Sequence, residues 1–579
     1  MYSVIPVVVG LRLISFILAR THRGIIRHTS SQDGIRIFLV LLFGSILLAL
    51  SNVVRYFFID ALFNIPFSVI IIEFLLAAVL LIGSRLTIRL VYTKSNAAGR
   101  GIKKVILYGA GEAGIIAKRT IDRDGYSGLK VIAFIDDNKK LAKKRIEGAT
   151  IYHTNQLEQL LQKNKISELI IAAQKILPEN KKRAIETCLR YDVKVRNVPP
   201  ANRWINGALS LNQIQTVKID DLLGRAPIQL NTEGIQSYLN NKRVLITGAA
   251  GSIGSELVRQ VMGFNPSELV LVDQAESPLY DLDLELRATF VGKHNFHIVI
   301  ADITQQERMK RVFEHFKPEV VFHAAAYKHV PLMEENPSEA LITNVLGTKH
   351  LVDLSLEFSV HKFVMISTDK AVNPTNVMGC TKRVAEIYAQ THNQLSATQF
   401  ITTRFGNVLG SNGSVIPLFK KQIENGGPVT ITHPEITRFF MTIPEACQLV
   451  LEAGSMGKGG EVFVFDMGKS VKIIDLAKKM IQLSGLTLGK DIEITISGLR
   501  PGEKLYEELL ATEENTLPTH HPQILIGKVK EYTIADVKNQ INELVPLFHK
   551  QDNMAIVSKL KAIVPEYISN NSVYSKLDD

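Results

Sequence analysis

The sequence predicts an α/β protein in which N-terminal transmembrane helices precede two doubly wound parallel-sheet domains. Three observations predict this architecture. The first hundred residues hold three long apolar runs, the remainder alternates apolar runs with helical patterns, and two glycine-rich turns each stand between a strand and a helix. At 579 residues the chain is longer than a single core supports, so several domains are expected.

The three apolar runs are Val4–Leu18, Ile37–Val54 and Ile65–Ile82. Each is close to the roughly 20 helical residues that cross a bilayer. Residues 1–90 are therefore expected to form a transmembrane region of about three spans, with a soluble helical domain as the alternative.

Basic residues flank these runs unevenly. The loop between the second and third runs holds only Arg55 and Asp60. The other ends carry many more basic residues, which are Arg20, Arg23, Arg27, Arg85, Arg89, Lys94, Arg100, Lys103 and Lys104. Because basic flanks stay on the cytoplasmic side, the chain after residue 85 is expected in the cytoplasm. Glu73 lies inside the third run, where a charge is costly, and it receives no role.

Composition excludes several classes of protein. The three cysteines, Cys188, Cys380 and Cys447, are scattered and fit no disulfide framework, and no Cys/His cluster has zinc spacing. A reducing compartment and no metal are expected. The formal charge of +11 comes without an arginine-rich run that interleaves aromatics, so no nucleic-acid partner is expected.

The first glycine turn lies in "KKVILYGAGEAGIIAKRT". Gly109, Gly111 and Gly114 have the spacing G-x-G-x-x-G, and Asp136 and Asp137 end the next predicted strand. This pattern predicts a Rossmann-like domain, because glycines let a pyrophosphate approach a helix N-terminus and an acid can hold a ribose. Two interpretations stay open: nucleotide binding, or a turn that serves close strand–helix packing.

The second glycine turn lies in "NKRVLITGAAGSIGSELVRQV" and gives a stronger signal. It has the spacing T-G-x-x-G-x-x-G, and the residues expected to face a cofactor are Gly248, Gly251, Ser252, Ile253 and Gly254. This order of strand, turn and helix predicts a second Rossmann-like domain that holds a dinucleotide.

The following strands extend this cofactor site. Asp273 ends the next strand, where its carboxylate can accept both ribose hydroxyls and would repel a 2′-phosphate, so NAD is favoured over NADP. Asp302 and Ile303 follow a third strand, where an adenine edge can be read. Ala324 and Ala325 are small enough to let the chain pass close to the cofactor.

The segment "STDKAVNPTNVMGCTK" carries the expected chemistry. Nicotinamide-dependent sugar enzymes place a tyrosine hydroxyl four residues before a lysine, but here Met378 stands four residues before Lys382. A thioether neither donates nor accepts a proton at neutral pH, so proton transfer has to use other groups.

At this point the chain resembles the extended short-chain dehydrogenase/reductase family. More narrowly, it resembles the membrane-bound nucleotide-sugar 4,6-dehydratases of bacterial capsule, O-antigen and glycan synthesis. The motifs are "TGAAGSIG", "HAAAYKHVPLMEENP", "STDKAVNPTNVMGCTK", "RFGNVLGSNGSVIPLF", "TRFFMT" and "RPGEKLYEEL", and the resemblance covers nearly the whole chain. In this branch a methionine replaces the tyrosine. Such proteins commonly have four spans, whereas this chain offers three.

The resemblance implies a UDP-N-acetylglucosamine 4,6-dehydratase with a C-terminal substrate subdomain. The product would be a UDP-4-keto-6-deoxy-N-acetylhexosamine, made by moving a hydride from C4 to NAD and back to C6. It also implies a bacterial inner or cell membrane location, a cytoplasmic catalytic domain, and a homodimer formed through the helix that carries Lys382.

The same resemblance implies the catalytic roles. Lys382 would bind the nicotinamide ribose and, as a cation, favour loss of the C4 proton, and Thr368 would hydrogen-bond the C4 hydroxyl. Asp369 would protonate the leaving C6 hydroxyl, which requires a raised pKa. Lys370 would be the base at C5, which requires a depressed pKa. Met378 occupies the tyrosine position of this catalytic set.

Substrate contacts are expected from the remaining motifs. These motifs supply basic groups for the diphosphate, an acid for the uridine ribose and backbone or amide groups for the nucleotide sugar. The residues are Lys328, Asn407, Ser414, Val415, Ile416, Arg438, Arg500 and Glu503.

Five segments follow from these patterns. They are the transmembrane region 1–90, the first Rossmann-like domain 100–195, a linker 196–235, the dehydratase domain 236–515 and a C-terminal tail 516–579. The tail is charged, ends in "SNNSVYSKLDD" and is expected to fray.

Two other functions stay open. A UDP-sugar C4 epimerase needs the same cofactor but no acid and base at C5 and C6, so the neighbours Asp369 and Lys370 speak against it. A non-catalytic membrane protein that binds NAD or UDP-sugar would explain Met378. The presence of Lys382 and Asp369 argues against a loss of catalytic activity.

Overall fold

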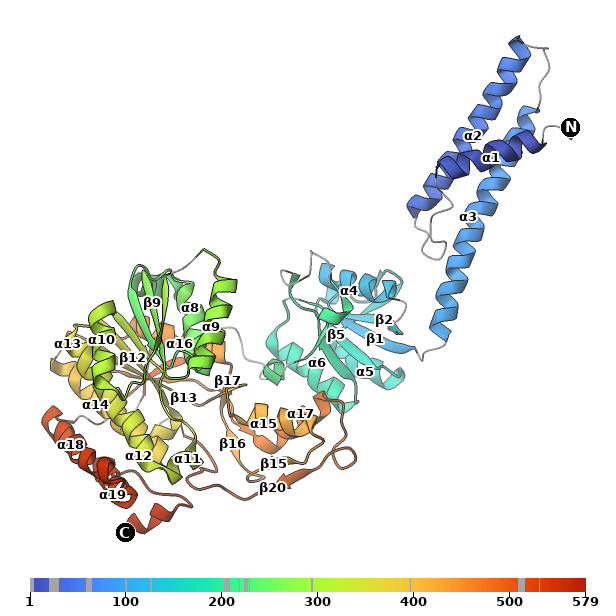
Figure 1. Ribbon diagram of the computed structural model, residues 1–579. Helices are drawn as coiled ribbons and strands as arrows, with labels where there is room; N and C mark the ends of the chain where they lie inside the picture. The colour runs from blue at the N-terminus through green and yellow to red at the C-terminus, as the bar shows by residue number, and fades with distance from the viewer. Residues whose placement is uncertain are drawn as a thin grey trace. The chain divides into compact units, whose positions relative to one another are not determined.

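The computed structural model forms two compact units (Figure 1). One comprises Met1–Lys175 with Val193–Thr216, and the other comprises Ile176–Asp192 with Val217–Asp579. The structure describes residues 5–19, 31–58, 65–98, 102–124, 128–173, 175–201, 204, 209–217, 219–222, 228, 230–292, 295–395, 397–508, 516–528, 530 and 532–578.

The three apolar runs form helices α1 (Ile5–Leu18), α2 (Ser31–Phe58) and α3 (Phe67–Ala98). Within the described residues, only α2 and α3 are long and apolar enough to cross a membrane. Helix α1 is also apolar but shorter, so a third span stays a prediction. Its 14 residues reach only about 21 Å, at roughly 1.5 Å per residue, against about 30 Å of hydrocarbon.

The charges inside the first and third runs neutralise each other. Arg12 Nε donates to Glu73 Oε1 at 3.0 Å, and the same guanidinium donates to Leu41 O at 2.6 Å and to Ser45 Oγ at 2.7 Å. This network ties α1 to both longer helices, which explains how the two charged side chains are tolerated among apolar residues.

The predicted orientation depends partly on residues outside the described ones. Arg20, Arg23, Arg27, Asp60 and Arg100 all lie there. The cytoplasmic placement of the chain after residue 85 therefore stays a prediction.

The first domain contains a seven-stranded sheet in the order β3-β4-β2-β1-β5-β6-β7, parallel from β4 to β6. Strand β7 pairs with β6, so the start of the predicted linker belongs to this sheet. Its elements are β1 (Lys103–Tyr108), α4 (Glu112–Arg123), β2 (Leu129–Asp136), β3 (Arg145–Ile146), β4 (Ala149–His153), α5 (Leu157–Lys163), β5 (Glu168–Ile171), β6 (Lys194–Asn197) and β7 (Gln215–Thr216).

The glycines of this domain serve close packing. Gly109 has a φ of +112°, and a Cβ there would lie 2.6 Å from Ala173 Cβ. A Cβ on Gly114 would lie 1.9 Å from Gly109 O. Asp136 accepts a hydrogen bond from Ala110 N at 2.8 Å, which fastens the turn to β2. These contacts account for the motif without a ligand, and whether the domain binds a nucleotide stays open.

The second unit is built on a nine-stranded sheet in the order β10-β9-β8-β11-β12-β13-β18-β22-β21. Strands β10 to β18 are parallel, and β22 and β21 are antiparallel additions. The strands are β8 (Arg243–Thr247), β9 (Glu268–Asp273), β10 (Phe296–Ile300), β11 (Val320–His323), β12 (Lys362–Thr368), β13 (Gln399–Phe405), β18 (Val462–Phe465), β21 (Thr516–Pro518) and β22 (Ile524–Gly527). The strand order reverses at β8, so ligands are expected at the carboxyl ends beside it.

Helices cover both faces of this sheet and form two apolar cores with it. They are α7 (Thr232–Leu239), α8 (Ser252–Met262), α9 (Glu276–Thr289), α10 (Gln306–Phe316), α11 (Val330–Glu335), α12 (Pro337–Ala340), α13 (Thr348–Glu357), α14 (Val377–Thr391), α16 (Ile443–Met456), α18 (Ile534–Lys550) and α19 (Asn553–Ile563). Helix α6 (Pro178–Arg190) also belongs to this unit.

A smaller subdomain follows β13 and has its own apolar core. It consists of β14 (Asn407–Val408), α15 (Val415–Glu424), β15 (Val429–Ile431), β16 (Thr437–Arg438), β17 (Phe440–Met441), β19 (Val471–Lys472), α17 (Ile473–Leu483) and β20 (Ile494–Ile496). It occupies the place expected for a substrate subdomain.

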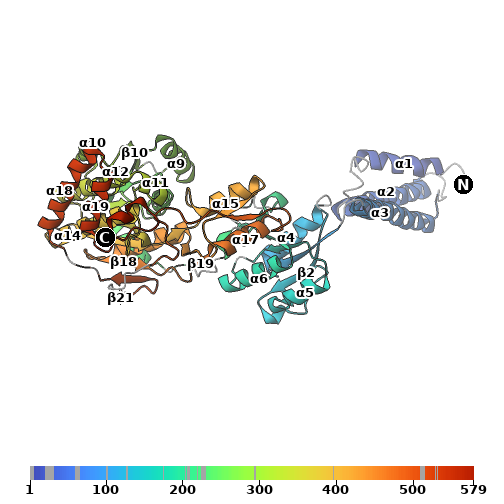
Figure 2. The same cartoon turned by 90° about the horizontal axis from the view of Figure 1, so that it is seen from below.

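The expectation that the tail frays is wrong. Strands β21 and β22 extend the main sheet, and α18 and α19 lie beside α14 (Figures 1 and 2). The tail contributes fully buried side chains, among them Ile541 and Leu560, to the same core as α14. Burial of these apolar side chains outweighs the charge of the exposed faces that suggested disorder.

The homodimer expected through α14 stays a prediction, although α14 is already covered within the chain. Every residue of this helix except Gln390 is buried within the chain, because α18 and α19 cover the face that a partner would need.

The Arg12–Glu73 pair predicts a specific pattern of stability. Arg12→Leu should lower the stability of the helical region by about 3 kcal/mol, because it leaves Glu73 as an unpaired charge among apolar residues. The double variant Arg12→Leu/Glu73→Leu should regain most of that loss. Denaturation midpoints of the full chain in detergent measure both, and equal losses in the single and double variants would contradict the pairing.

Candidate active site

The second glycine turn forms a cradle between β8 and α8. Gly248 has a φ of +68°, and a Cβ there would lie 2.6 Å from Ala325 N. A Cβ on Gly254 would lie 2.0 Å from Gly248 O. Helix α8 begins after Gly251 without a side-chain cap, so its first backbone N–H groups are free to meet an anion.

Asp273 stands at the end of β9 beside this cradle. Its Oδ2 accepts from Ala250 N and its Oδ1 from Ala275 N, each at 3.0 Å. These bonds fix the carboxylate, and each oxygen keeps a lone pair for a ribose hydroxyl.

A cavity collects most of the predicted cofactor residues. Its lining includes Gly248, Gly251, Asp273, Asp302, Ile303, Ala324 and Ala325. Ser252, Ile253 and Gly254 form the first turn of α8 rather than the cavity wall. Tyr327 and Thr343 line the cavity as well and had not been predicted. A strand-end carboxylate, an uncapped helix start and small residues together fit a dinucleotide.

The segment predicted to be catalytic begins at the carboxyl end of β12. Thr368 Oγ1 donates to Asp369 Oδ1 at 2.9 Å, and Lys370 Nζ lies 3.1 Å from the same oxygen. The side chain of Asp369 is 0% exposed. Thr368 and Asp369 are therefore held behind Lys370, which lines a second cavity that they do not line.

The pKa values of this pair follow from burial and charge. Burial, and then the negative charge of Glu507, raise the pKa of Asp369 to about 7, which is the direction expected of a general acid. Burial alone would lower the pKa of Lys370, but the carboxylates of Asp369 and Glu507 outweigh it and raise that pKa. The expectation of a depressed pKa for Lys370 is wrong, because the two acids beside it stabilise its charged form.

Glu507 is a residue of this candidate site that the sequence did not lead us to predict. Its Oε1 lies 2.7 Å from Lys370 Nζ and 3.2 Å from Arg438 Nε, and its Oε2 accepts from Asn407 Nδ2 at 3.2 Å. The signal was present, since Glu507 stands four residues after Glu503 in "RPGEKLYEEL".

Lys382 lies deeper, on α14. Its Nζ donates to Ile366 O at 2.8 Å, and burial lowers its pKa to about 8. Lys382 lines neither of the two cavities.

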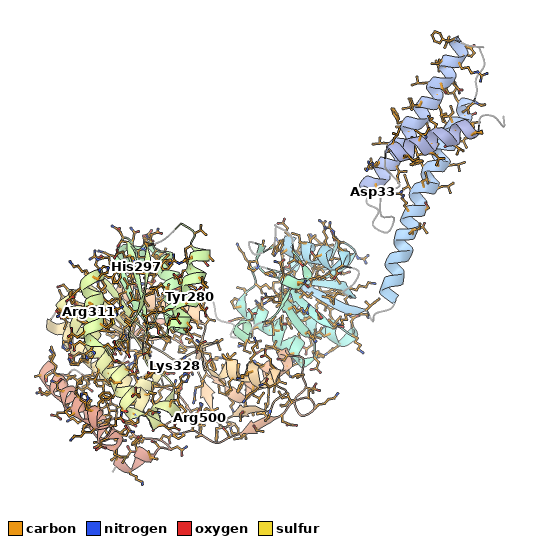
Figure 3. The ribbon with its side chains drawn as sticks, in the orientation of Figure 1. Asp33, Tyr280, His297, Arg311, Lys328 and Arg500 are labelled. Carbon is orange, nitrogen blue, oxygen red and sulfur yellow. The ribbon has the colours of Figure 1, made fainter. Side chains whose placement is uncertain are left out.

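Most predicted substrate residues surround the second cavity, of about 250 Å³. They are Lys328, Asn407, Ser414, Val415, Arg438, Arg500 and Glu503, and Figure 3 labels Lys328 and Arg500 among them. Ile416 does not line this cavity and is buried in the subdomain core. Tyr327 and Lys328 are consecutive and line the first and the second cavity, so the two cavities are neighbours.

The two arginines that are predicted to bind the diphosphate form ion pairs with Glu503 in this structure. Arg438 Nη2 lies 3.4 Å and Arg500 Nη2 lies 3.2 Å from Glu503 Oε1. Burial, and then the charge of Lys370, lower the pKa of Lys328. Lys328 lines this cavity, where an anionic group would stabilise its charged form.

The C-terminal segment fastens the loop that carries these groups. Asn570 Nδ2 donates to Glu503 O at 3.0 Å, and Gly502 N donates to Asn570 O at 2.8 Å. Asn571 Nδ2 donates to Leu499 O at 2.8 Å. Asn570 N also donates to Thr375 O at 3.1 Å, which joins this loop to the segment before α14.

Met378 is a packing residue in this structure. It is 3% exposed, belongs to the apolar core beneath α14 and lines neither cavity. Its assignment to the catalytic set is therefore supported only by its place in the motif.

A cradle for a dinucleotide beside a buried acid–lysine pair defines a nicotinamide-dependent enzyme of the short-chain dehydrogenase/reductase class. Residues 244–529 match the family model described as "Polysaccharide biosynthesis protein", and residues 21–199 match one described as "CoA-binding domain".

The chain belongs to the polysaccharide biosynthesis family of nucleotide-sugar enzymes. It is 44% identical over 493 residues to the capsular polysaccharide biosynthesis protein CapD of Staphylococcus aureus, covering 84% of this chain and 82% of that protein. It is 33% identical over 283 residues to a UDP-N-acetylglucosamine 4,6-dehydratase (inverting) of Campylobacter jejuni, covering 48% and 80%. It is 34% identical over 281 residues to a UDP-glucose 4-epimerase of Rickettsia canadensis, covering 47% and 79%.

If Met378 only fills space, Met378→Leu should keep activity within about twofold and cost less than about 1.5 kcal/mol, since the swap conserves volume. Steady-state rates and thermal unfolding of the variant measure both quantities. A folded but inactive Leu variant would show that the thioether takes part in the reaction.

Asn570→Ala should weaken substrate binding, because it releases the loop that carries Arg500 and Glu503. One hydrogen bond of about 1 kcal/mol corresponds to a rise of roughly fivefold in KM for the nucleotide sugar, with kcat unchanged. Asn539→Ala, an exposed position on α18, is the matched control. An unchanged KM in the Asn570 variant would contradict the clamping role.

Proposed function

We propose that this protein is a UDP-N-acetylglucosamine 4,6-dehydratase that forms a UDP-4-keto-6-deoxy-N-acetylhexosamine for cell-surface polysaccharide or glycan synthesis. The observation that carries the proposal is the contact of 3.1 Å between Lys370 and the buried Asp369, next to a cavity lined by basic residues. The dehydratase from Campylobacter jejuni supports this choice of reaction.

NAD, when bound, accepts the hydride from C4 and returns it to C6. Gly248, Gly251 and Asp273 would hold its pyrophosphate and adenosine ribose, and the carboxylate of Asp273 favours NAD over NADP. Lys382 would bind the nicotinamide ribose, and Thr368 would accept a hydrogen bond from the C4 hydroxyl.

The acid and the base work as one pair. Lys370 has a raised pKa, so it must give up its proton before it can take one from C5. Asp369 Oδ1 is 3.1 Å away and can receive that proton, which leaves a neutral amine beside a neutral acid. The amine then removes the C5 proton, and the acid supplies the proton for the leaving C6 hydroxyl.

The epimerase is the second candidate, because the chain is also similar to a UDP-glucose 4-epimerase. C4 epimerisation requires no acid and base at C5 and C6. The buried pair of Asp369 and Lys370 would then have no role in proton transfer, which favours the dehydratase.

Helices α2 and α3 support a membrane location. Both are long and apolar enough to span a bilayer. We infer a multi-pass protein of a bacterial cell membrane with its second unit in the cytoplasm, where UDP-sugars are made.

The full chain in detergent, mixed with UDP-N-acetylglucosamine in deuterated water, tests the reaction by proton NMR. A new C6 methyl signal that has lost its coupling to C5 is expected. Lys370→Ala should lower the rate by about 10²–10⁴-fold, because the C5 base is gone. A product that is only the C4 epimer would support the epimerase, and a bound but unchanged substrate would support a binding protein.

A further inference from the structure

Two acids, not one, stand at the catalytic lysine. Lys370 contacts Asp369 Oδ1 at 3.1 Å and Glu507 Oε1 at 2.7 Å. Glu507 is 2% exposed and lines the substrate cavity, whereas Asp369 is 0% exposed and does not. The carboxyl that faces a bound sugar is therefore that of Glu507.

The second oxygen of Asp369 needs a proton. Asp369 Oδ2 is buried and has no hydrogen-bond partner as a carboxylate, and a Cβ on Gly406 would lie only 2.8 Å from it. The carboxyl groups of Asp369 and Glu507 both contact Lys370 Nζ, so the two acids lie close together in a buried site. Two buried carboxylates beside one ammonium repel each other, which favours one proton held by the pair.

The proton rests on Asp369. Glu507 has two cations within 3.2 Å, Lys370 and Arg438, and accepts from Asn407, all of which favour its charged form. Asp369 has one cation and complete burial, which favour its neutral form. The other charged groups around the pair are Lys328, Glu503, Lys504 and Glu508.

We propose that the acid of this dehydration is a carboxyl pair, in which Asp369 and Glu507 share one proton and Glu507 passes it to the sugar. The proposal rests on the proposed function. It explains how a wholly buried Asp369 can serve a hydroxyl that it does not touch.

Lys370 first passes its ammonium proton to Asp369 Oδ1 as Asp369 passes its own proton from Oδ2 to Glu507, which leaves a neutral amine and a protonated Glu507. The amine takes the C5 proton, and the C5–H electron pair forms the C5–C6 double bond conjugated with the C4 ketone. The C6–O bond breaks with its electron pair on oxygen, which receives the proton of Glu507, and water leaves. Lys370 is then again an ammonium, Asp369 is protonated and Glu507 is a carboxylate, as at the start.

Infrared spectra of the full chain without substrate test the shared proton. The carbonyl band of a protonated acid, identified by its loss in Asp369→Asn, should titrate near pH 7 in the parent protein. In Glu507→Gln the midpoint should fall by about one pH unit or more, because the negative charge that opposes ionisation is gone. Glu508→Gln makes the same charge change one residue away on an exposed side chain and should leave the midpoint unchanged.

Rates test the relay. Glu507→Gln cannot carry a proton and should lower kcat by at least about 10²-fold with little change in KM, whereas Glu507→Asp keeps a carboxyl and should recover part of the rate. If the Gln variant does not fold, Glu507→Asp alone must shift the infrared midpoint and reduce kcat.

An unchanged midpoint, or equal rates for the Gln and Asp variants, would overturn the proposal. The spectra require no turnover. A parent protein that shows the shared proton but makes no 4-keto-6-deoxy sugar would therefore refute the proposed function and leave the carboxyl pair standing.

Discussion

The balance of charge around Lys370 is the interaction on which the rest of the site depends. The Lys370 ammonium lies within 3.1 Å of the carboxyl groups of Asp369 and Glu507, which are almost completely shielded from solvent. Such a cluster is stable only if every charge has a partner, and Arg438 and Asn407 complete it from the subdomain. The main sheet and the subdomain are thus joined through the catalytic groups themselves.

This arrangement separates two chemically similar acids. Asp369 and Glu507 differ in exposure by very little, yet the pKa of Asp369 is raised to about 7 and that of Glu507 is lowered to about 2. The difference comes from the number of cations beside each. Two acids with such different pKa values can serve as a proton donor and as a charged group beside it, which the proposed dehydration requires. A tyrosine at the position of Met378 is then unnecessary for the proton at C6.

The sequence predicts the parts of the site that depend on local geometry. The turn at Gly248 and the strand-end Asp273 have fixed spacing along the chain, so their meeting at one cavity could be predicted. The acidic Asp369 could be recognised in the same way. The raised pKa of Lys370 could not, because it depends on Glu507, which lies 137 residues further along the chain and reaches the site through the fold.

The C-terminal region shows the same limit on a larger scale. Its charged residues suggested a frayed tail, because composition alone does not show that the apolar faces of its helices pack against another part of the chain. In the folded chain α18 and α19 cover α14, and Asn570 and Asn571 hold the loop of Arg500. The contacts of Arg12 in α1 could not be predicted either, because its partners lie on α2 and α3.

In the proposed reaction, the hydride that leaves C4 of the sugar returns to C6 of the same molecule. Lys370, Asp369 and Glu507 move the protons. UDP-N-acetylglucosamine labelled with deuterium at C4, converted by the full chain and analysed by NMR and mass spectrometry, tests this reaction most directly. The account predicts a 4-keto product that carries the label in its C6 methyl group. A label that is lost to solvent, or that remains at an inverted C4, would contradict it.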